Sequence, residues 1–200
     1  MKKQVIAALA LAAATLFSGN ALAQTKEGPW MVRVRAVNLQ SANTDSTDLG
    51  MGLSINDKTI PEIDISYFFT KNIAVELILT VPQEQNLYSN GAKIGTFNHL
   101  PPTVLAQYHF DAPGFKPYVG VGLNYTLFSG AELPAGVTID RSSTGGALQV
   151  GADIPLSGNM YLNLDIKKVY LGTKVYVNGA DHGTLSVDPL LVGVGLGWRF

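Results

Sequence analysis

The chain ends in Val192-Gly193-Val194-Gly195-Leu196-Gly197-Trp198-Arg199-Phe200, a stretch with a period of two. Successive side chains of a β-strand point to opposite faces, so one face here is wholly apolar and the other carries three glycines and Arg199. A soluble sheet must bury such an apolar stripe, whereas a membrane barrel turns it outward into lipid. Trp198 and the terminal Phe200 are typical of the last strand of bacterial outer-membrane barrels. We predict that they form the signal read by the outer-membrane assembly machinery.

The first 23 residues have the pattern of a secretory signal peptide. Lys2 and Lys3 precede an apolar run, and Ala21-Leu22-Ala23 matches a small-x-small cleavage site. The run is about 13 residues long, too short for a helix to cross a hydrocarbon core of ~30 Å. A retained membrane anchor is the alternative, but no stop-transfer pattern follows. We therefore expect a signal peptide over residues 1–23 and one barrel domain over residues 24–200.

Composition limits the remaining classes of protein. Without Lys2 and Lys3, 12 basic residues face 15 acidic ones, which argues against a nucleic-acid partner. The chain has no cysteine, so neither disulfides nor thiolate metal sites hold it together. Hydrophobic residues make up 46% and charged residues only 14%, as expected for a protein with lipid outside and water inside. After residue 23, no apolar stretch is long enough for a transmembrane helix, so strands must cross the membrane.

Apolar and polar residues alternate in eight segments of the mature chain. The connections between them are alternately short, at residues 70–72, 111–116 and 155–159, and long and polar, at residues 41–59, 81–98, 129–144 and 170–187. We predict an all-β fold, an eight-stranded antiparallel transmembrane β-barrel with short periplasmic turns and long extracellular loops. A soluble sandwich does not place every long loop on one side. The expected location is the outer membrane of a Gram-negative bacterium, in contact with membrane lipids and lipopolysaccharide. The expected strands cover residues 30–40, 60–69, 73–80, 99–110, 117–128, 145–154, 160–169 and 188–200.

Aromatic residues gather near the short-turn ends of these strands. This placement predicts an interfacial girdle on the periplasmic side, whereas ordinary enrichment of aromatics in strands does not explain the clustering. Tyr125, Phe128 and Tyr170 are expected to begin the outer girdle. The periplasmic set comprises Trp30, Tyr67, Phe68, Phe69, Tyr108, Phe110, Phe115, Tyr118, Trp198 and Phe200.

The minority face of the strands is polar and charged, and in a barrel it points into the lumen. An eight-stranded barrel has little internal space, so these side chains nearly fill it. Opposite charges there must pair or be hydrated. We expect a salt-bridged plug in the lower lumen, with a narrow wet conduit as the alternative. The predicted polar network comprises Arg33, Arg35, Glu62, Asp64, Glu76, Gln107, His109, Asp153, Asn163, Asp165, Lys167 and Arg199.

Pro101-Pro102 stands near the top of the predicted fourth strand. Proline has no backbone N–H, so at least one ladder hydrogen bond is missing there. The doublet is either a strand boundary just above the membrane or a gap in the wall through which a ligand leaves sideways.

Catalytic motifs are absent or weak. His99 and His182 have candidate aspartates nearby, but no HExxH or GxSxG spacing surrounds any histidine. A lone loop histidine is usually a solvated surface residue. We therefore expect no enzyme and no cofactor, and we expect His109 to hydrogen-bond within the lumen.

The chain resembles the OmpW family, including its alkane-uptake relatives of the AlkL type. The resemblance rests on the order and spacing of several segments. They are residues 28–35 (GPWMVRVR), 99–103 (HLPPT) before 107–110 (QYHF), 116–125 (KPYVGVGLNY), 162–168 (LNLDIKK), and Asp188-Pro189 before the Trp-Arg-Phe end.

The resemblance implies a hydrophobic upper channel, closed below by polar side chains, and release of small hydrophobic molecules sideways into the membrane. Apolar residues in the otherwise polar loops are then expected to line a funnel: Leu53, Ile55, Phe97, Leu127 and Phe128, with Leu49, Met51, Ile60, Val81, Leu87, Ile94, Leu133, Val137 and Ile139 beside them. The leading hypothesis is passive uptake of small hydrophobic ligands, with Pro101 and Pro102 at the exit. A narrow ion or small-solute pore and an adhesive barrel with surface-binding loops are the alternatives.

Overall fold

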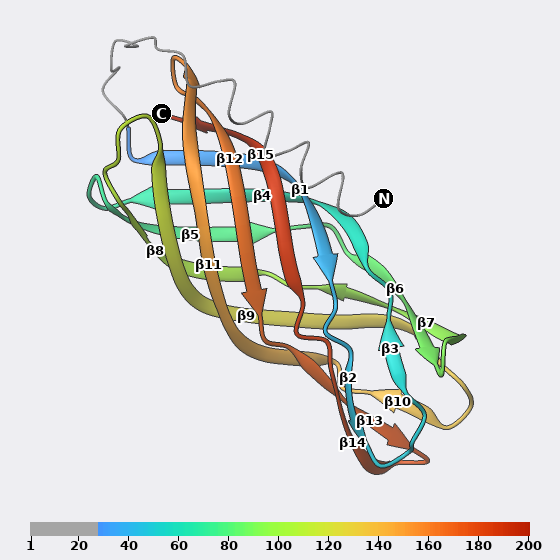
Figure 1. Ribbon diagram of the computed structural model, residues 1–200. Helices are drawn as coiled ribbons and strands as arrows, with labels where there is room; N and C mark the ends of the chain where they lie inside the picture. The colour runs from blue at the N-terminus through green and yellow to red at the C-terminus, as the bar shows by residue number, and fades with distance from the viewer. Residues whose placement is uncertain (1–27) are drawn as a thin grey trace.

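The computed structural model describes residues 28–200, so the expected signal peptide lies outside the described residues. Eight antiparallel strands form a closed barrel (Figure 1). Around the wall their order is β1, β4, β5, β8, β9, β11, β12 and β15, and β15 pairs again with β1. Their bounds are β1 Trp30–Gln40, β4 Lys58–Phe68, β5 Ile73–Leu79, β8 Thr103–His109, β9 Lys116–Glu132, β11 Ser142–Ser157, β12 Met160–Val169 and β15 Leu190–Arg199. Among these residues there is no helix long and apolar enough to cross a membrane.

The C-terminal strand closes the barrel. β15 pairs with β12 on one side and with β1 on the other, with Val34 opposite Leu196. The last residue is paired as well, because Trp30 N donates to Phe200 O at 3.0 Å and Phe200 N donates to Trp30 O at 2.9 Å. Trp198 and Phe200 therefore belong to the closing seam, and their role as an assembly signal stays a prediction.

The two faces of the wall differ as the period of two predicts. Val121 on β9 is 60% exposed on the outside of the barrel, whereas Arg35 and Asp165 are each 2% exposed inside it. In a membrane the exposed valines, leucines and isoleucines contact acyl chains, which removes their apolar surface from water. The charged residues are thus held inside and away from lipid.

The aromatic girdle at the short-turn end is present, with three corrections. Trp30, Phe69, Tyr108, Phe110, Phe115 and Phe200 are exposed, and ring pairs such as Trp30–Tyr67 and Tyr108–Phe110 lie 4.8 and 4.9 Å apart. Phe68 and Tyr118, however, are buried in the lumen, and Phe128 points inward instead of joining the outer girdle. Each has the same parity along its strand as inward polar neighbours, so alternation places it inside.

The long connections are more ordered than predicted, because they form strands that extend the wall outward. β6 (Gln83–Ser89) and β7 (Ala92–Leu100) form a hairpin that pairs with β3 (Leu53–Ile55) and with the end of β9. A separate four-stranded sheet has the order β10 (Val137–Ile139), β13 (Gly172–Val177), β14 (Ala180–Ser186) and β2 (Thr44–Thr47). Both extensions lie at the end away from the C-terminus in Figure 1.

The predicted fourth strand, residues 99–110, is two strands. Pro101 and Pro102 divide it, so that His99 ends up in β7 and Thr103 begins β8. β8 pairs with β9 as far as Thr103–Asn124, and β7 then pairs with β9 from Leu100–Leu127. β9 therefore continues as a single strand, while the strand paired with it changes from β8 to β7.

Candidate functional site: the barrel lumen

Arg33 joins four strands through the lower lumen. Its Nε and Nη2 donate to Asp153 Oδ1 and Oδ2 at 3.1 and 2.7 Å. Its Nη1 donates to Glu76 Oε1 at 2.9 Å and to Ser66 Oγ at 2.8 Å. Such a paired guanidinium–carboxylate contact is stronger and more directional than a neutral hydrogen bond. Arg33 on β1 is thereby tied to β4, β5 and β11.

Arg35 lies two residues further along β1 and contacts a second set of carboxylates. Its Nε is 2.8 Å from Asp64 Oδ2, and its Nη1 is 2.9 Å from Asp165 Oδ1. These two contacts are ion pairs without hydrogen-bond alignment. Its Nη2 donates to Glu76 Oε1 at 2.9 Å, and Lys167 forms a third cationic centre with Glu62. Glu76 therefore bridges the two arginines.

Amide side chains donate hydrogen bonds to the carboxylate oxygens that the cations do not contact. Gln107 and Gln149 each donate from Nε2 to Glu76 Oε2 at 2.9 Å. Gln149 also donates to Asp165 Oδ2 at 2.8 Å. Glu76 and Asp165 thus accept from neutral donors as well as from charged ones, as buried carboxylates require.

Tyr118 on β9 reaches over the adjacent strand β11 to hydrogen-bond with β12. Its hydroxyl donates to Asp165 Oδ2 at 2.9 Å and accepts from Asn163 Nδ2 at 3.0 Å. Asn163 Nδ2 also donates to Asp153 Oδ1 at 2.8 Å. The tyrosine ring lies over Gly151, where an added Cβ would be 2.4 Å from the hydroxyl oxygen. Only glycine leaves room for the ring at this position.

Stacked rings close the periplasmic end of the network. His109 lies between Phe68 and Tyr118, with ring centroids 4.8 and 4.9 Å away, and its Nε2 is 3.1 Å from Gln107 Oε1. Below it, the Arg199 guanidinium lies 3.7 Å from the Phe68 ring centroid and donates from Nε to Gly28 O at 3.0 Å. All twelve predicted network residues are buried in the lumen. We call this set, with Ser66, Phe68, Tyr118 and Gln149, the polar plug.

The charges of the polar plug are unequal in number. Its ion-paired centre holds three cations, Arg33, Arg35 and Lys167, against five carboxylates. Removing one partner of a buried ion pair is strongly destabilising, because the remaining charge is left without compensation. The three cations are therefore the scarce component. The carboxylates are Glu62, Asp64, Glu76, Asp153 and Asp165.

The upper lumen is apolar. Above the polar plug, buried side chains from the barrel and its extensions form one hydrophobic cluster, which includes Leu39, Leu87, Leu105, Val175 and Leu185. It encloses a cavity of about 40 Å³, bounded below by Glu62 and Lys167, which we call the inner cavity. A second cavity of about 80 Å³, the outer cavity, lies between the extensions.

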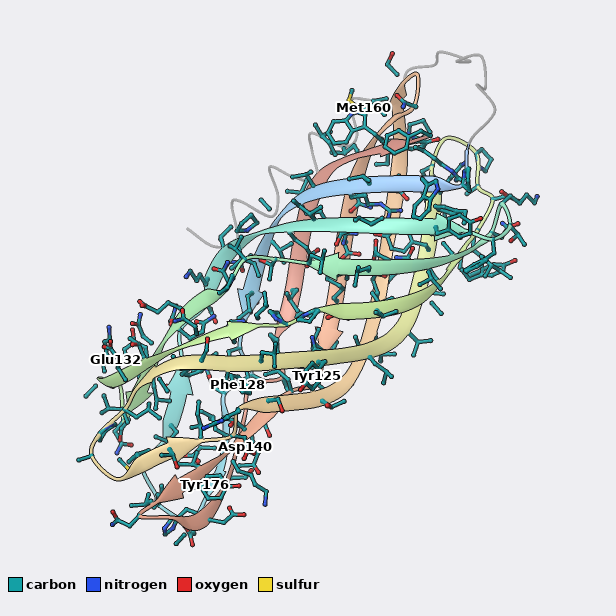
Figure 2. All side chains as sticks on the ribbon, turned by 180° about the vertical axis from the view of Figure 1, so that it is seen from behind. Tyr125, Phe128, Glu132, Asp140, Met160 and Tyr176 are labelled. Carbon is teal, nitrogen blue, oxygen red and sulfur yellow. The ribbon has the colours of Figure 1, made fainter. Side chains whose placement is uncertain are left out.

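Phe97 lines both cavities and therefore separates them. Its ring packs edge-on against Phe128, with centroids 5.8 Å apart. In Figure 2, Phe128 lies on β9 between the barrel wall and the extracellular sheet, where Tyr176 donates to Asp140 at 3.1 Å. The two rings thus stand between the outside and the inner cavity.

Four of the five predicted funnel residues lie in this apolar cluster. Leu53, Ile55, Phe97 and Phe128 are buried there, and their role in a funnel stays a prediction. Leu127 is not among them, because it is 42% exposed on the lipid-facing side. It alternates with Phe128 along β9, so only one of the two can point inward. Val81 is likewise exposed outside.

A discontinuity in the wall lies beside the inner cavity. The β5–β8 ladder ends at Ile78–Thr103, and the β6–β7 ladder begins at Gln83–His99. Between them, no backbone pair of the described chain joins residues 79–82 to residues 100–102. Pro82, Pro101 and Pro102 in these segments have no N–H to donate. We call this place the proline window; Thr80 and Pro101 line the cavity there.

Several lumen residues were missed or misplaced. His99 is buried in the cavity wall instead of solvated, and Asn124 and Thr126 form a buried hydrogen bond of 2.7 Å above the polar plug. Strand parity predicts the inward position of Tyr118, Asn124 and Thr126, because they alternate with Val119 and Val121. The same parity was available for His99, because it begins the expected strand 99–110 and alternates with the inward Thr103 and Gln107, but it was interpreted as a solvated loop histidine.

These features define a class of protein: an outer-membrane β-barrel of eight strands with an apolar upper lumen and an ion-paired floor. The OmpW family profile matches residues 24–200, and the chain belongs to the OmpW family. The "Uncharacterized outer-membrane protein y4mB" of Sinorhizobium fredii is 41% identical over 187 residues, covering 86% of this chain and 80% of the relative. "Outer membrane protein W" of Escherichia coli is 32% identical over 215 residues, covering 100% of both chains.

The fold is also similar to that of a solved structure. The crystal structure of the outer membrane protein OprG from Pseudomonas aeruginosa has a TM-score of 0.75 and 23% sequence identity, covering 90% of this chain and 99% of that one. Because the sequence identity with OprG is only 23%, this similarity supports the fold and nothing about function. Together with the outward apolar face, the family places the chain in the outer membrane of a Gram-negative bacterium.

Proposed function

We propose that this protein is a passive channel that takes small hydrophobic molecules from outside the cell and releases them sideways into the outer membrane. The observation that carries the proposal is the division of the lumen into an apolar upper half and an ion-paired floor. An apolar molecule gains free energy on leaving water for the upper lumen, by about 25 cal/mol per Å² buried. It gains nothing from the floor, where it would separate charges from their partners. The resemblance to AlkL-type relatives, one of which has a similar solved fold, supports the same function.

The proline window supports the sideways direction of release. Its two edges, residues 79–82 and 100–102, have no ladder hydrogen bonds between them, so parting them breaks none. Asn124 and Tyr125 bind the Pro102 carbonyl from β9, which fixes one edge of the window to the wall. On the other edge, Leu79 pairs with Ile63 and Thr80 Oγ1 donates to Pro61 O, so movement is expected at residues 81–82.

The ion-pore alternative requires a water-filled path through the polar plug. The hydrogen bonds and ion pairs of Arg33 and Arg35 run from β1 to β5, β11 and β12, and that of Lys167 joins β12 to β4. We therefore expect a conductance in planar bilayers close to that of the lipid alone.

The test measures accumulation of n-octane by cells carrying the protein or an empty vector. Because the chain has no native cysteine, Val81→Cys and Pro102→Cys can be joined across the proline window by a short thiol-reactive crosslinker. The control pair is Val75→Cys and Ala106→Cys, which face each other in the intact β5–β8 ladder. Crosslinking the window should reduce uptake to the empty-vector rate, and crosslinking the control pair should not.

Two results would count against the proposal. If the wild type accumulates octane no faster than the empty vector, the uptake function is wrong. If uptake is fast but indifferent to crosslinking at the window, lateral release at this place is wrong and the molecule leaves by another path.

A further inference from the structure

The inner cavity contains a polar atom that the protein itself does not use. His99 on β7 is 5% exposed and lines the cavity. Its Nδ1 is fully buried and makes no hydrogen bond. A buried polar nitrogen without a partner is costly, typically by about 1–3 kcal/mol. A molecule that supplies the missing bond would therefore be favoured in this cavity.

The other polar side chains of the cavity wall already have partners. Those at the base and at the proline window are joined to each other or to the backbone, so they present a satisfied surface to a ligand. The bonds are Lys167 Nζ to Glu62 Oε1 at 2.5 Å, Asn124 Nδ2 to Thr103 Oγ1 at 2.8 Å, and Thr80 Oγ1 to Pro61 O at 2.6 Å. Among these residues, His99 is the one with a fully buried nitrogen that lacks a partner.

The surroundings of the His99 ring select an uncharged partner. The His99 ring has a hydrogen bond with the backbone of Gln83 and lies near the ammonium of Lys58, and none of the ion pairs among the described residues joins it to a carboxylate. The Gln83 side chain lies opposite in the ladder, and its Nε2 donates to Val81 O at 3.0 Å. The remaining wall is mostly apolar, with Ile60, Phe97 and Phe128 among its members. A ligand here needs an apolar body and one hydrogen-bonding group.

We propose that His99 is a hydrogen-bonding subsite for small apolar molecules that carry a hydroxyl group. The inference rests on the uptake function proposed above and names the preferred substrate class. A neutral imidazole has one donor and one acceptor nitrogen, and a hydroxyl group complements either one. An alkane of equal length fills the same apolar space but leaves Nδ1 unpaired. The protein should therefore take up an alkanol in preference to the corresponding alkane.

The cavity also indicates how such a molecule is seated. At about 40 Å³ it holds a hydroxyl group and the first carbons of a chain, so a longer tail has to displace Phe97 towards the outer cavity. Because Phe97 is two residues before His99 on β7, both side chains point to the same side of the strand. The hydroxyl group would then lie at His99 with the tail towards the outside.

The uptake test compares 1-octanol with n-octane in cells carrying wild type, His99→Leu, His99→Gln or the control His182→Gln. Each rate is corrected for the empty vector. Loss of one hydrogen bond predicts that His99→Leu lowers the octanol-to-octane ratio about fivefold, with octane uptake unchanged. His99→Gln keeps a donor and an acceptor and should retain part of the preference. His182, which pairs with Asp48 on the extracellular sheet, should have no effect when replaced.

A binding measurement on the wild type does not depend on the variant folding. In lipid bilayers, 1-octanol should shift the imidazole ¹⁵N resonances of His99 and leave those of His182 unchanged, whereas n-octane should shift neither. Equal uptake of both probes by wild type and His99→Leu, or no His99 shift at saturating octanol, would overturn the subsite and leave the uptake function standing. If neither probe enters faster than with the empty vector, both proposals are wrong.

Discussion

Replacing Arg35 by methionine tests whether the polar plug holds the barrel together. Arg35 contacts four carboxylates, Glu62, Asp64, Glu76 and Asp165, at N–O distances from 2.8 to 3.4 Å. Its side chain is fully buried, so solvent does not screen these contacts. Methionine fills the space of the aliphatic stem but removes the charge. The ion-paired centre of the plug would then hold five carboxylates against two cations, Arg33 and Lys167.

The expected loss follows from the cost of leaving buried charges without a partner. Removing one member of a buried ion pair costs about 3–5 kcal/mol, which corresponds to a decrease of two to four orders of magnitude in the folding equilibrium constant. The free energy of unfolding can be measured with urea in lipid vesicles, by the fluorescence of Trp30 and Trp198. Both tryptophans lie in the closing β1–β15 seam, so they report on the barrel itself.

Two controls decide whether the loss comes from buried charge. Lys71→Met breaks the exposed pair with Asp111, whose side chains are 76% and 66% exposed, and should leave the unfolding curve unchanged. Adding Asp64→Asn to Arg35→Met removes one of the stranded carboxylates and should restore part of the stability. If Arg35→Met unfolds like Lys71→Met, or if Asp64→Asn restores nothing, the ion pairs do not stabilise the barrel as argued.

Three further substitutions probe other parts of the molecule. Gly151→Ala places a Cβ 2.4 Å from the ring and hydroxyl of Tyr118 and should cost about 1–3 kcal/mol in urea unfolding, whereas Gly146→Ala on the same strand has no heavy atom closer than 3.8 Å and should be neutral. Phe97→Ala should join the inner and outer cavities, so the rate of octane uptake should rise. The free energy of unfolding should fall by about 3–5 kcal/mol. Slower uptake would show that the ring does not obstruct the path. Partial burial disfavours the charged form of Asp45, but hydrogen bonds from Leu53 N and Thr47 outweigh it and hold the pKa of Asp45 below its usual value of 3.8. Its stabilisation is therefore present at neutral pH and is lost as the pH falls through that lowered pKa. Asp45→Asn at pH 7 should reduce the hydrogen-exchange protection of the Leu53 amide, and full protection in this variant would contradict the argument.

The barrel strands and the polar plug are predictable from the sequence because one rule governs both. A strand that separates lipid from a packed lumen alternates strictly, so Val121 and Asn124, three residues apart, must lie on opposite faces. Applied without exception, the same rule places Tyr118 and Phe68 in the lumen and Leu127 outside it. The girdle prediction for Tyr118 and Phe68 and the funnel prediction for Leu127 were wrong because they followed aromatic or apolar character instead of strand parity.

The extracellular extensions were harder to predict because their strands face water on one side and carry mixed polar residues. One local signal was present nonetheless. Asn90-Gly91 and Asn178-Gly179 adopt positive φ, at 48° and 83° and at 50° and 84°, as expected for two-residue hairpin turns. These dipeptides mark the turns of β6–β7 and β13–β14. The partners β3, β10 and β2 have only three or four residues each, too few for a periodic pattern.

On the proposed route, the relative cost of two exits from the inner cavity sets the direction of transport. The downward exit passes Lys167 and Arg35, and opening it separates buried ions at several kcal/mol for each ion. The sideways exit passes Pro82, Pro101 and Pro102, where no ladder hydrogen bond has to break. An apolar molecule also stays out of water along the sideways exit and so keeps the free energy gained on entering the lumen. On this proposal the polar plug sets the direction of transport as well as stabilising the barrel, because its high cost of opening would make the membrane the easier destination.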